Sequence, residues 1–369
     1  MKSVTCSGPV NIAVIKYWGK KDEKLITPLN DSISVTLSQD ELRAKTTVTL
    51  SETYAEDKIW LNGIEEPISN PRLQACLREI RARAQTQHGS IPAGCVQIVS
   101  ENNFPTAAGL ASSAAGYACL VFALSRLYDV SGDISAVARQ GSGSACRSVL
   151  GGFVRWRAGE RPDGTDSLAE QVAPASHWPD LHCLILIACH DRKKVASTSG
   201  MSRTAETSEL MRARLEGLPA RLTAITTAIE QRDFPAFAEL TMRDSNQLHA
   251  VCQDTYPPIR YMTDVSHAVV ETVHTYNRLL GGMRACYTFD AGPNACIYLP
   301  AAEVGPFLAA VARVFPPPDP ACWVTGRSVE LPQLPEELAA ELQPRIPGGV
   351  QGVIHTAVGD GPRLLEQTE

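Results

Sequence analysis

The spacing of apolar positions predicts strands in the first part of the chain. Apolar and polar residues alternate over residues 32–37 and 45–50, and a period of two is typical of a strand with one buried face. Short apolar stretches flanked by turn-forming residues predict further strands. These stretches cover residues 10–14, 58–62, 96–100, 153–154 and 181–188.

Helical spacing of apolar residues is frequent further along the chain. In residues 72–83, Leu73, Cys76, Leu77 and Ile80 fall on one helical face. Because strands cluster early and long helices later, the pattern favours an α+β fold over a doubly wound α/β fold. The other predicted helices cover residues 114–128, 134–139, 206–230 with a break at 217–219, 234–251, 259–280 and 304–314, and the late strands cover 285–289, 295–299 and 350–358.

Length and charge limit the possible functions. A chain of 369 residues predicts two domains, which we place at residues 1–185 and 186–369. With 44% hydrophobic and 20% charged residues, it can bury a large core. The net charge of −6 offers no general attraction to nucleic acid or to an anionic membrane, so any charge that binds phosphate must be local.

The cysteines and the apolar runs predict a soluble cytosolic protein. Eleven scattered cysteines, with no C-x-x-C pair, argue against a complete disulfide framework and favour a reducing compartment. No apolar run approaches the roughly 20 residues of a membrane span, and the first residues lack a secretory signal pattern. We therefore expect no membrane partner.

The most informative segment is N-N-F-P-T-A-A-G-L-A-S-S-A-A-G, residues 102–116. Gly109, Ser112 and Ser113 precede or begin a long apolar helix, whose N-terminus carries unpaired N–H groups and about half a positive charge. Small residues there let a phosphate approach the backbone. The alternative is that these residues only allow close packing of a helix on a sheet.

Two further segments combine cations and hydroxyls. Residues 16–20 (K-Y-W-G-K) follow a predicted strand, and Lys16, Tyr17 and Lys20 can bind an anion there; a solvated charged loop is the alternative. In G-S-G-S-A-C-R-S, residues 141–148, two serines and Arg147 can surround a diphosphate, whereas a flexible linker would have no use for the arginine.

A carboxylate completes the set of candidate groups. Asp290 ends a predicted strand before A-G-P-N and can face a site, although Asp with Gly two residues later is also an ordinary turn. One base candidate, two phosphate-binding loops and several cations are the parts of a phosphoryl-transfer site, in which the protein positions groups and stabilises charge.

In order along almost the whole chain, these segments resemble the diphosphomevalonate decarboxylase family. The matching strings are V-N-I-A-V-I-K-Y-W-G-K (10–20), residues 102–116, residues 141–148, D-S-N-Q-L-H-A (244–250) and Y-T-F-D-A-G-P-N-A (287–295). Related kinases of the galactokinase, homoserine kinase, mevalonate kinase and phosphomevalonate kinase (GHMP) superfamily usually have G-L-G-S-S where this chain has G-L-A-S-S. They also lack the string at 141–148.

The resemblance implies a reaction and a fold. Diphosphomevalonate and ATP, with Mg²⁺ as the divalent cation, would give isopentenyl diphosphate, CO₂, ADP and phosphate. The implied fold is the two-domain α+β GHMP-kinase fold, with a ribosomal-protein-S5-like N-terminal domain and a ferredoxin-like C-terminal domain. A homodimer is expected by analogy. The short segment at 85–94 and the C-terminal tail are expected to be peripheral.

The resemblance also implies roles for individual residues. Asp290 would be the catalytic acid/base beside the C3 hydroxyl, with Arg147 and Lys16 as catalytic partners. Arg72 would bind the substrate; the alternative is a solvated position at the start of a helix. The implied substrate-binding residues are Tyr17, Trp18, Gly19, Lys20, Arg72, Ser142, Gly143, Ser144, Ala145, Cys146, Arg147 and Thr198. The implied ATP-binding residues are Ala108, Gly109, Leu110, Ala111, Ser112, Ser113 and Ala114, and Ser113 is also the implied metal ligand.

Two alternatives to the decarboxylase remain at this stage. A kinase of the same superfamily would phosphorylate mevalonate or phosphomevalonate and release no CO₂. A non-catalytic metabolite-binding protein would keep the cleft but would have no need of Asp290 as a base.

Overall fold

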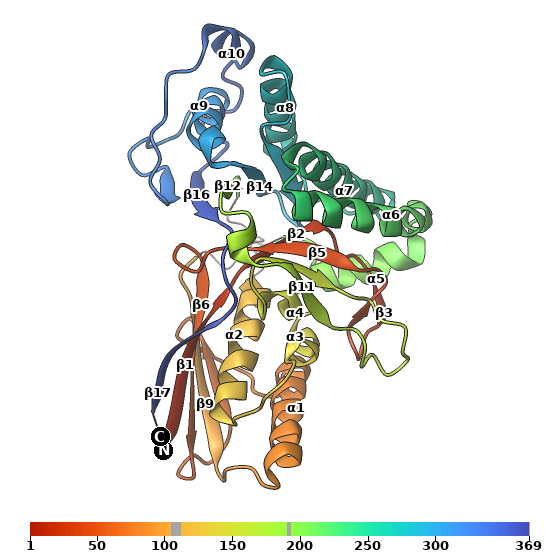
Figure 1. The fold of residues 1–369 in the computed structure, drawn as a ribbon, viewed down its shortest axis with the longest axis vertical. Helices are drawn as coiled ribbons and strands as arrows, with labels where there is room; N and C mark the ends of the chain where they lie inside the picture. Colours follow the sequence, from red (N-terminus) through yellow and green to blue (C-terminus); the bar gives the residue numbers. More distant parts are fainter. Residues whose placement is uncertain (105–111, 190–192, 369) are drawn as a thin grey trace.

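The computed structural model describes residues 1–104, 112–189 and 193–368. Figure 1 shows an elongated molecule with two lobes, the lower built mainly from the early chain and the upper from the later chain. The larger of two clusters of buried apolar side chains runs from the sheets of the lower lobe into the sheet of the upper lobe. The two lobes therefore share a core, and groups from both can be held in fixed geometry between them.

The lower lobe contains a six-stranded sheet with one face covered by helices. Its β7 and β9 are parallel and its other pairs antiparallel. Every second residue of β6 is buried, as the period of two predicts, and α2 packs on β1 and β6 beside α1 and α3. The strands in order are β17 (Arg363–Thr368), β1 (Lys2–Pro9), β6 (Arg43–Ser51), β9 (Cys95–Asn102), β7 (Lys58–Leu61) and β8 (Ile64–Glu66), and the helices are α1 (Pro71–His88), α2 (Ser112–Leu127) and α3 (Ser135–Gly141).

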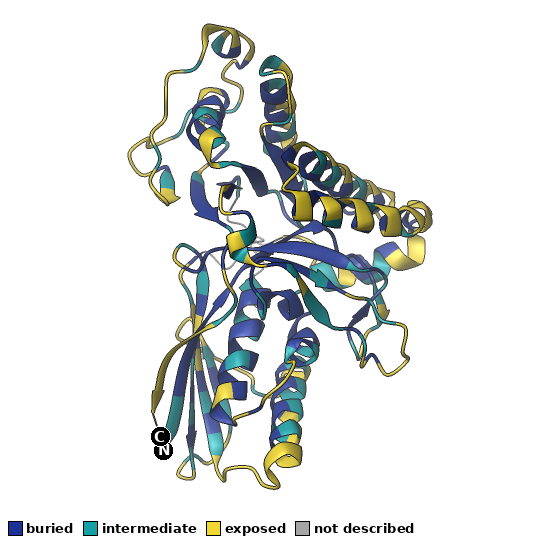
Figure 2. Ribbon diagram, viewed as in Figure 1, coloured by how far each residue is buried: buried dark blue, intermediate teal, exposed yellow. Residues whose placement is uncertain are grey.

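A four-stranded antiparallel sheet lies where the lobes meet. Every residue of its strands β2 and β5 is buried, as Figure 2 shows. β2 ends at Ile15, and the next residue, Lys16, contacts Asp290 of the later chain, so the end of β2 lies at the boundary between the lobes. The order is β11 (Ala169–Ala173), β10 (Phe153–Trp156), β5 (Ser32–Thr36) and β2 (Asn11–Ile15), and the hairpin β3 (Lys20–Asp22)–β4 (Thr27–Pro28) and the short helix α4 (Ala145–Ser148) lie nearby.

The upper lobe is a five-stranded sheet with helices. Helices α6 and α7 form an antiparallel pair, and α7 packs on both β13 and β2. The strands in order are β13 (Cys286–Phe289), β14 (Ala295–Pro300), β12 (Leu181–Ile187), β16 (Gly352–Ala357) and β15 (Val324–Gly326). The helices are α5 (Ser197–Thr207), α6 (Leu210–Gln231), α7 (Phe234–Asp254), α8 (Asp264–Leu279), α9 (Val304–Val314) and α10 (Glu336–Glu341), with 3-10 turns at Ala175–His177 and Ala301–Glu303.

Several expectations about the elements need correction. The predicted break at 217–219 is wrong: α6 runs through Pro219, which lies on the exposed side of the helix, where water can satisfy the carbonyl group that the proline leaves without a donor. The break falls instead between α5 and α6. The C-terminal tail forms β17, the edge strand of the first sheet, paired with β1.

The division at residue 185 stays a prediction, but it would cut through β12. All hydrogen-bonded neighbours of β12 belong to the second half of the chain. A boundary before Leu181 keeps the upper sheet whole, while β17 returns to the lower lobe.

Candidate active site

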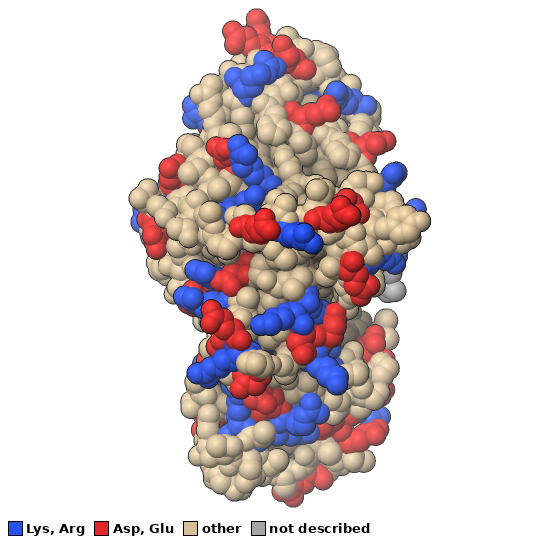
Figure 3. Space-filling model, turned by 90° about the vertical axis from the view of Figure 1, so that its right-hand side faces the viewer, with Lys and Arg blue, Asp and Glu red and all other residues tan. Residues whose placement is uncertain are grey.

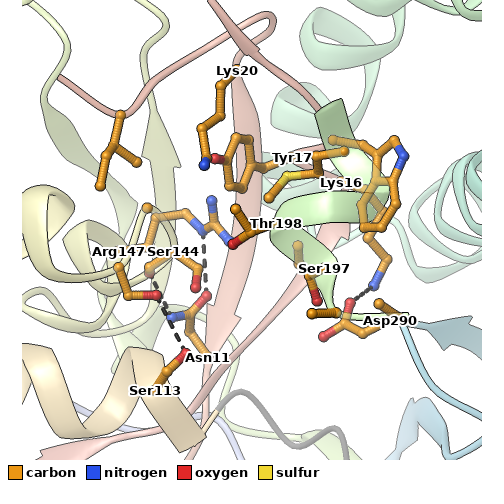
Figure 4. A pocket seen from close by; sticks show the side chains of 18 of the residues that line it. Asn11, Lys16, Tyr17, Lys20, Ser113, Ser144, Arg147, Ser197, Thr198 and Asp290 are labelled. Atoms are coloured by element: carbon orange, nitrogen blue, oxygen red, sulfur yellow. Dashed lines mark hydrogen bonds and ion pairs between the residues drawn. The ribbon is translucent and has the colours of Figure 1, made fainter. Parts of the chain in front are cut away.

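A cavity of about 380 Å³ lies between the lobes, where the predicted segments converge. Figure 4 shows Lys16 and Asp290 on one side of it and Arg147, Ser144, Asn11 and Ser113 on the other. The predicted site residues that line it are Lys16, Tyr17, Trp18, Lys20, Arg72, Ser112, Ser113, Ser142, Gly143, Ser144, Arg147, Thr198 and Asp290.

Other predicted residues lie behind the cavity or outside the described part of the chain. Ala114, Ala145 and Cys146 are fully buried in the core, where they support the loops that line the cavity. Gly19 has a φ of 107°, and a Cβ there would lie 2.5 Å from the side chain of Leu29, so its function is to allow the turn. Ala108, Gly109, Leu110 and Ala111 fall outside the described residues.

Lys16 and Asp290 form an ion pair across the lobes. Lys16 follows β2, Asp290 follows β13, and Lys16 Nζ lies 2.5 Å from Asp290 Oδ1. The lysine side chain is 3% exposed and that of the aspartate 32% exposed, so the carboxylate is the member that a ligand in the cavity can reach. The backbone carbonyl of Asp290 accepts from Gly292 N–H at 2.7 Å, so the sequence A-G-P-N makes a turn while the side chain faces the cavity.

Arg147 is a buried cation with only neutral partners. Its Nε donates to Asn11 Oδ1 at 3.3 Å and to Ser34 Oγ at 3.0 Å, and its Nη1 donates to Ser32 Oγ at 2.6 Å. Among the described residues, no carboxylate lies within ion-pairing distance of this guanidinium and no acceptor bonds its Nη2. Burial lowers the pKa of Arg147 below its usual value. A buried cation without a counterion is typical of a site that receives an anion.

The loop before α4 presents hydroxyls and tightly packed backbone. Ser142 Oγ lies 3.4 Å from Ser113 Oγ at the start of α2, which brings the two predicted phosphate-binding segments together. Gly143 is required because a Cβ there would lie 2.9 Å from both the Trp156 and the Tyr17 rings. Those rings pack edge-to-face at 4.6 Å, and burial raises the pKa of the Tyr17 hydroxyl, which is therefore a neutral donor.

Two further contacts involve residues that line the cavity. Arg72 Nη2, on α1, donates to Thr198 Oγ1, on α5, at 3.2 Å, so the two predicted positions meet across the lobes. Lys20 pairs with Glu23, which also accepts from Ser202 Oγ at 2.9 Å. Burial opposes ionisation of Glu23, but the bonds from Lys20 and Ser202 leave its pKa below the usual value.

Two family models match the chain. The model of the diphosphomevalonate decarboxylase-like N-terminal domain matches residues 8–169, and the model of the mevalonate 5-diphosphate decarboxylase C-terminal domain matches residues 183–365. The chain belongs to the diphosphomevalonate decarboxylase family. The predictions of a decarboxylase of this family and of its two-domain α+β GHMP-kinase fold are confirmed.

Relatives of the decarboxylase family match over nearly their whole length. The diphosphomevalonate decarboxylase of Bos taurus is 52% identical over 374 residues, which cover 98% of this chain and 94% of that protein. Mevalonate diphosphate decarboxylase from Trypanosoma brucei has a TM-score of 0.92 and 39% identity, covering 99% of this chain and 98% of that one. MDDEF in complex with MVAPP, AMPPCP and magnesium has a TM-score of 0.77 and 31% identity, covering 99% of both.

A second cavity, of about 280 Å³, adjoins the first and was not predicted from the sequence. It shares Ser112 and Ser113 with the first cavity, so α2 begins between the two. Its walls include apolar side chains from β7, β9, α1 and α2, with amide groups from Asn70 and Asn102. This decarboxylase-family chain therefore has a mostly apolar pocket next to its candidate phosphate-binding helix end.

Asn11, Ser32 and Ser34 are functional candidates that the sequence analysis missed. Asn11 lies in a stretch that is otherwise apolar, and its Nδ2 donates to Ser144 O at 3.1 Å and to Ser148 Oγ at 2.7 Å. An asparagine inside a buried strand is a usable signal, because buried amides require specific partners. Ser32 and Ser34 alternate with apolar residues, a pattern that does not separate a solvent-facing side from a site-facing one.

Two further observations concern the charge on one face of the molecule and the apolarity of the helices. On the face drawn in Figure 3, acidic and basic side chains are interspersed. Within the described residues, we find no helix with the length and apolarity needed to cross a membrane.

Proposed function

We propose that this chain catalyses the ATP-dependent decarboxylation of (R)-5-diphosphomevalonate to isopentenyl diphosphate, CO₂, ADP and phosphate. Membership of the family supports the reaction. The observation that carries the assignment of residues is the Lys16–Asp290 pair at 2.5 Å in a cavity that also contains Arg147 and two serine-bearing loops.

The substrate would bind on the Arg147 side of the cavity. Arg147 Nη2, which bonds to no acceptor among the described residues, can donate to an anionic oxygen of the substrate, and charge-assisted bonds of this kind contribute about 1.5–3 kcal/mol each. Ser142 and Ser144 offer hydroxyls beside it, and the neutral Tyr17 hydroxyl has no partner among the described residues. Lys20 and Arg72, which also line the cavity, supply further positive charge.

Asp290 would act on the C3 hydroxyl of the substrate. The carboxylate accepts the hydroxyl proton while that oxygen attacks the γ-phosphorus of ATP and ADP departs. The C3–O bond then breaks, inorganic phosphate leaves, and the electrons of the C–CO₂⁻ bond form the new double bond as CO₂ departs. Lys16 holds the carboxylate in place and offsets negative charge near the transferring phosphoryl group.

ATP would span both cavities. Its phosphates would lie at the start of α2, where Ser112 and Ser113 are shared, and its nucleoside in the second cavity, whose apolar walls and amide groups suit a base and its polar edges. Support comes from the relative that was solved with AMPPCP and magnesium.

Magnesium is the proposed metal. This ion is usually held by one or two protein ligands together with substrate phosphates and water, and a related structure was solved with magnesium. The Ser113 hydroxyl lines the cavity at the start of α2 and is the candidate protein ligand. Bound Mg²⁺ would neutralise charge on the ATP phosphates. A homodimer in the cytosol completes the proposal, by analogy with the family.

The test is incubation with ATP, Mg²⁺ and diphosphomevalonate labelled with ¹⁴C at C1. We expect labelled CO₂ and ADP in equal amounts. ADP formed without CO₂ would identify a kinase, and neither product would identify a non-catalytic binding protein.

A further inference from the structure

One sequence string, D-S-N-Q-L-H-A, has no part in the mechanism above. It forms residues 244–250, within α7, which packs on both β2 and β13. Figure 1 shows α7 beside β2 at the junction of the lobes. Since β2 leads to Lys16 and β13 leads to Asp290, this part of α7 adjoins both strand ends that supply the ion pair.

Asp244 and Arg214 hold the backbone of Lys16. Both side chains are fully buried, and their ion pair measures 3.0 Å from Arg214 Nη1 to Asp244 Oδ1. Asp244 Oδ2 accepts from the Lys16 backbone N–H at 2.8 Å, and Arg214 Nη2 donates to the Lys16 carbonyl at 3.2 Å. Asn30 Nδ2 donates to the same carbonyl at 3.0 Å, and Arg221 Nη1 donates to Asp244 Oδ1 at 2.8 Å. Both backbone polar groups of Lys16 are therefore fixed.

The next residue of α7 holds the other strand. Ser245 is 1% exposed, and its Oγ accepts from the backbone N–H of Phe289 at 3.0 Å. Phe289 is the last residue of β13 and directly precedes Asp290. Two consecutive side chains of one helix thus bond the backbones on both sides of the Lys16–Asp290 contact.

We propose that Asp244 and Ser245 are positioning residues, which set the distance between the Lys16 ammonium and the Asp290 carboxylate during catalysis. This inference rests on the proposed function. A buried ion pair such as Asp244–Arg214 is weak evidence of stabilisation, because apolar residues of similar volume often stabilise a protein as well or better. Geometric control explains it, since a misplacement of about 1 Å at a reacting centre lowers rates by about 100-fold.

The principal test compares Ser245→Ala with Ser125→Ala. Ser125 is also a buried helical serine, but its hydroxyl bonds to Phe122 O within its own helix, so its loss reports only the general effect of such a substitution. We expect Ser245→Ala to lower kcat about 10-fold or more. The KM for each substrate should stay within threefold of the wild-type value, and Tm should shift by the same amount as in Ser125→Ala.

A double-mutant comparison separates positioning from general structural support. In an Asp290→Asn background the positioned carboxylate is absent, so Ser245→Ala should lower the remaining rate by less than threefold. Asp244→Asn, which retains the side-chain volume, should show the same dependence on the background with a larger loss in the wild-type background. It serves as the second variant if Ser245→Ala does not fold.

Two results would overturn the inference. One is a kcat for Ser245→Ala within twofold of the Ser125→Ala value. The other is an equal loss in the wild-type and Asp290→Asn backgrounds. Absence of CO₂ from the wild-type enzyme would instead count against the proposed function, so the two failures are distinguishable.

Discussion

Replacement of Arg147 by glutamine tests whether this residue binds diphosphomevalonate and not ATP. The arginine is 2% exposed and has no carboxylate partner among the described residues. Glutamine removes the charge and the bonds to Asn11, Ser32 and Ser34 but retains part of the side-chain volume. Two effects on the free energy of unfolding then oppose each other. Three charge-assisted bonds are lost, at about 1.5–3 kcal/mol each, and a desolvation penalty of several kcal/mol is relieved.

These opposing terms are similar in size, so we expect the free energy of unfolding of Arg147→Gln to change by no more than about 2 kcal/mol. Substrate binding has no such compensation. Loss of one or two bonds from Nη2 to an anionic oxygen should weaken diphosphomevalonate binding by about 2–4 kcal/mol, which is roughly 30-fold to 1000-fold in Kd.

The assay is calorimetric titration of each ligand. Diphosphomevalonate is titrated alone, and AMPPCP is titrated in the presence of saturating diphosphomevalonate, so that neither measurement involves turnover. We expect the AMPPCP Kd to stay within about threefold of the wild-type value. Arg147→Lys is the matched control, because it keeps the charge without the guanidinium geometry. Its Kd for diphosphomevalonate should lie between those of the wild type and Arg147→Gln. Equal losses for both ligands would refute the placement of Arg147 on the substrate side.

Two further predictions concern packing and pH. Gly143→Ala places a methyl group 2.9 Å from two aromatic rings, so we expect a loss of about 1–3 kcal/mol in unfolding free energy by urea denaturation and a lower kcat/KM. Burial lowers the pKa of His182 and of His249 from 6.5 to about 4, so the unfolded chain binds more protons between these pH values. The free energy of unfolding should therefore fall as pH falls from 6.5 to 4, by up to roughly 3 kcal/mol per histidine and by less for the partly exposed His182. In urea denaturation at a series of pH values, His249→Gln should reduce this dependence of the unfolding free energy on pH. An unchanged dependence would contradict the prediction.

Chemistry that is local in sequence could be predicted well. Lys16, Arg147 and Asp290 come from three distant segments; the two cations were candidates because they suit an anionic ligand, and Asp290 was a candidate base, whereas Arg72 was implied only by the family resemblance. Their convergence on one cavity depends on tertiary structure and was implied only by the family resemblance.

The function of the polar face of the buried strand β5 could not be predicted from the sequence. The alternation in β5 correctly predicts a strand, but the polar face of Ser32 and Ser34 points at Arg147 rather than at solvent. Periodicity shows that a strand has two different faces and does not show what each face meets. The contribution of Asp244 was missed for a similar reason, because its partners Lys16 and Arg214 are far away in the chain.

The terminal strands were missed for another reason. β17 is exposed at every residue, so it carries no alternation of buried and exposed positions, and its partner β1 lies at the opposite end of the chain. Pairing of this kind depends on long-range contacts that no local pattern encodes.

The helix through Pro219 shows the converse case, in which packing of α6 on α7 outweighs a local helix-breaking signal.

Asp290, as the group that accepts the C3 hydroxyl proton, is the central residue of the proposed reaction. The most direct measurement is single-turnover release of ¹⁴CO₂ by Asp290→Asn, with the diphosphomevalonate Kd measured on the same protein. We predict a rate lower by about 10²–10⁴-fold with the Kd within about threefold of the wild-type value. Release of ¹⁴CO₂ at close to the wild-type rate would contradict the account.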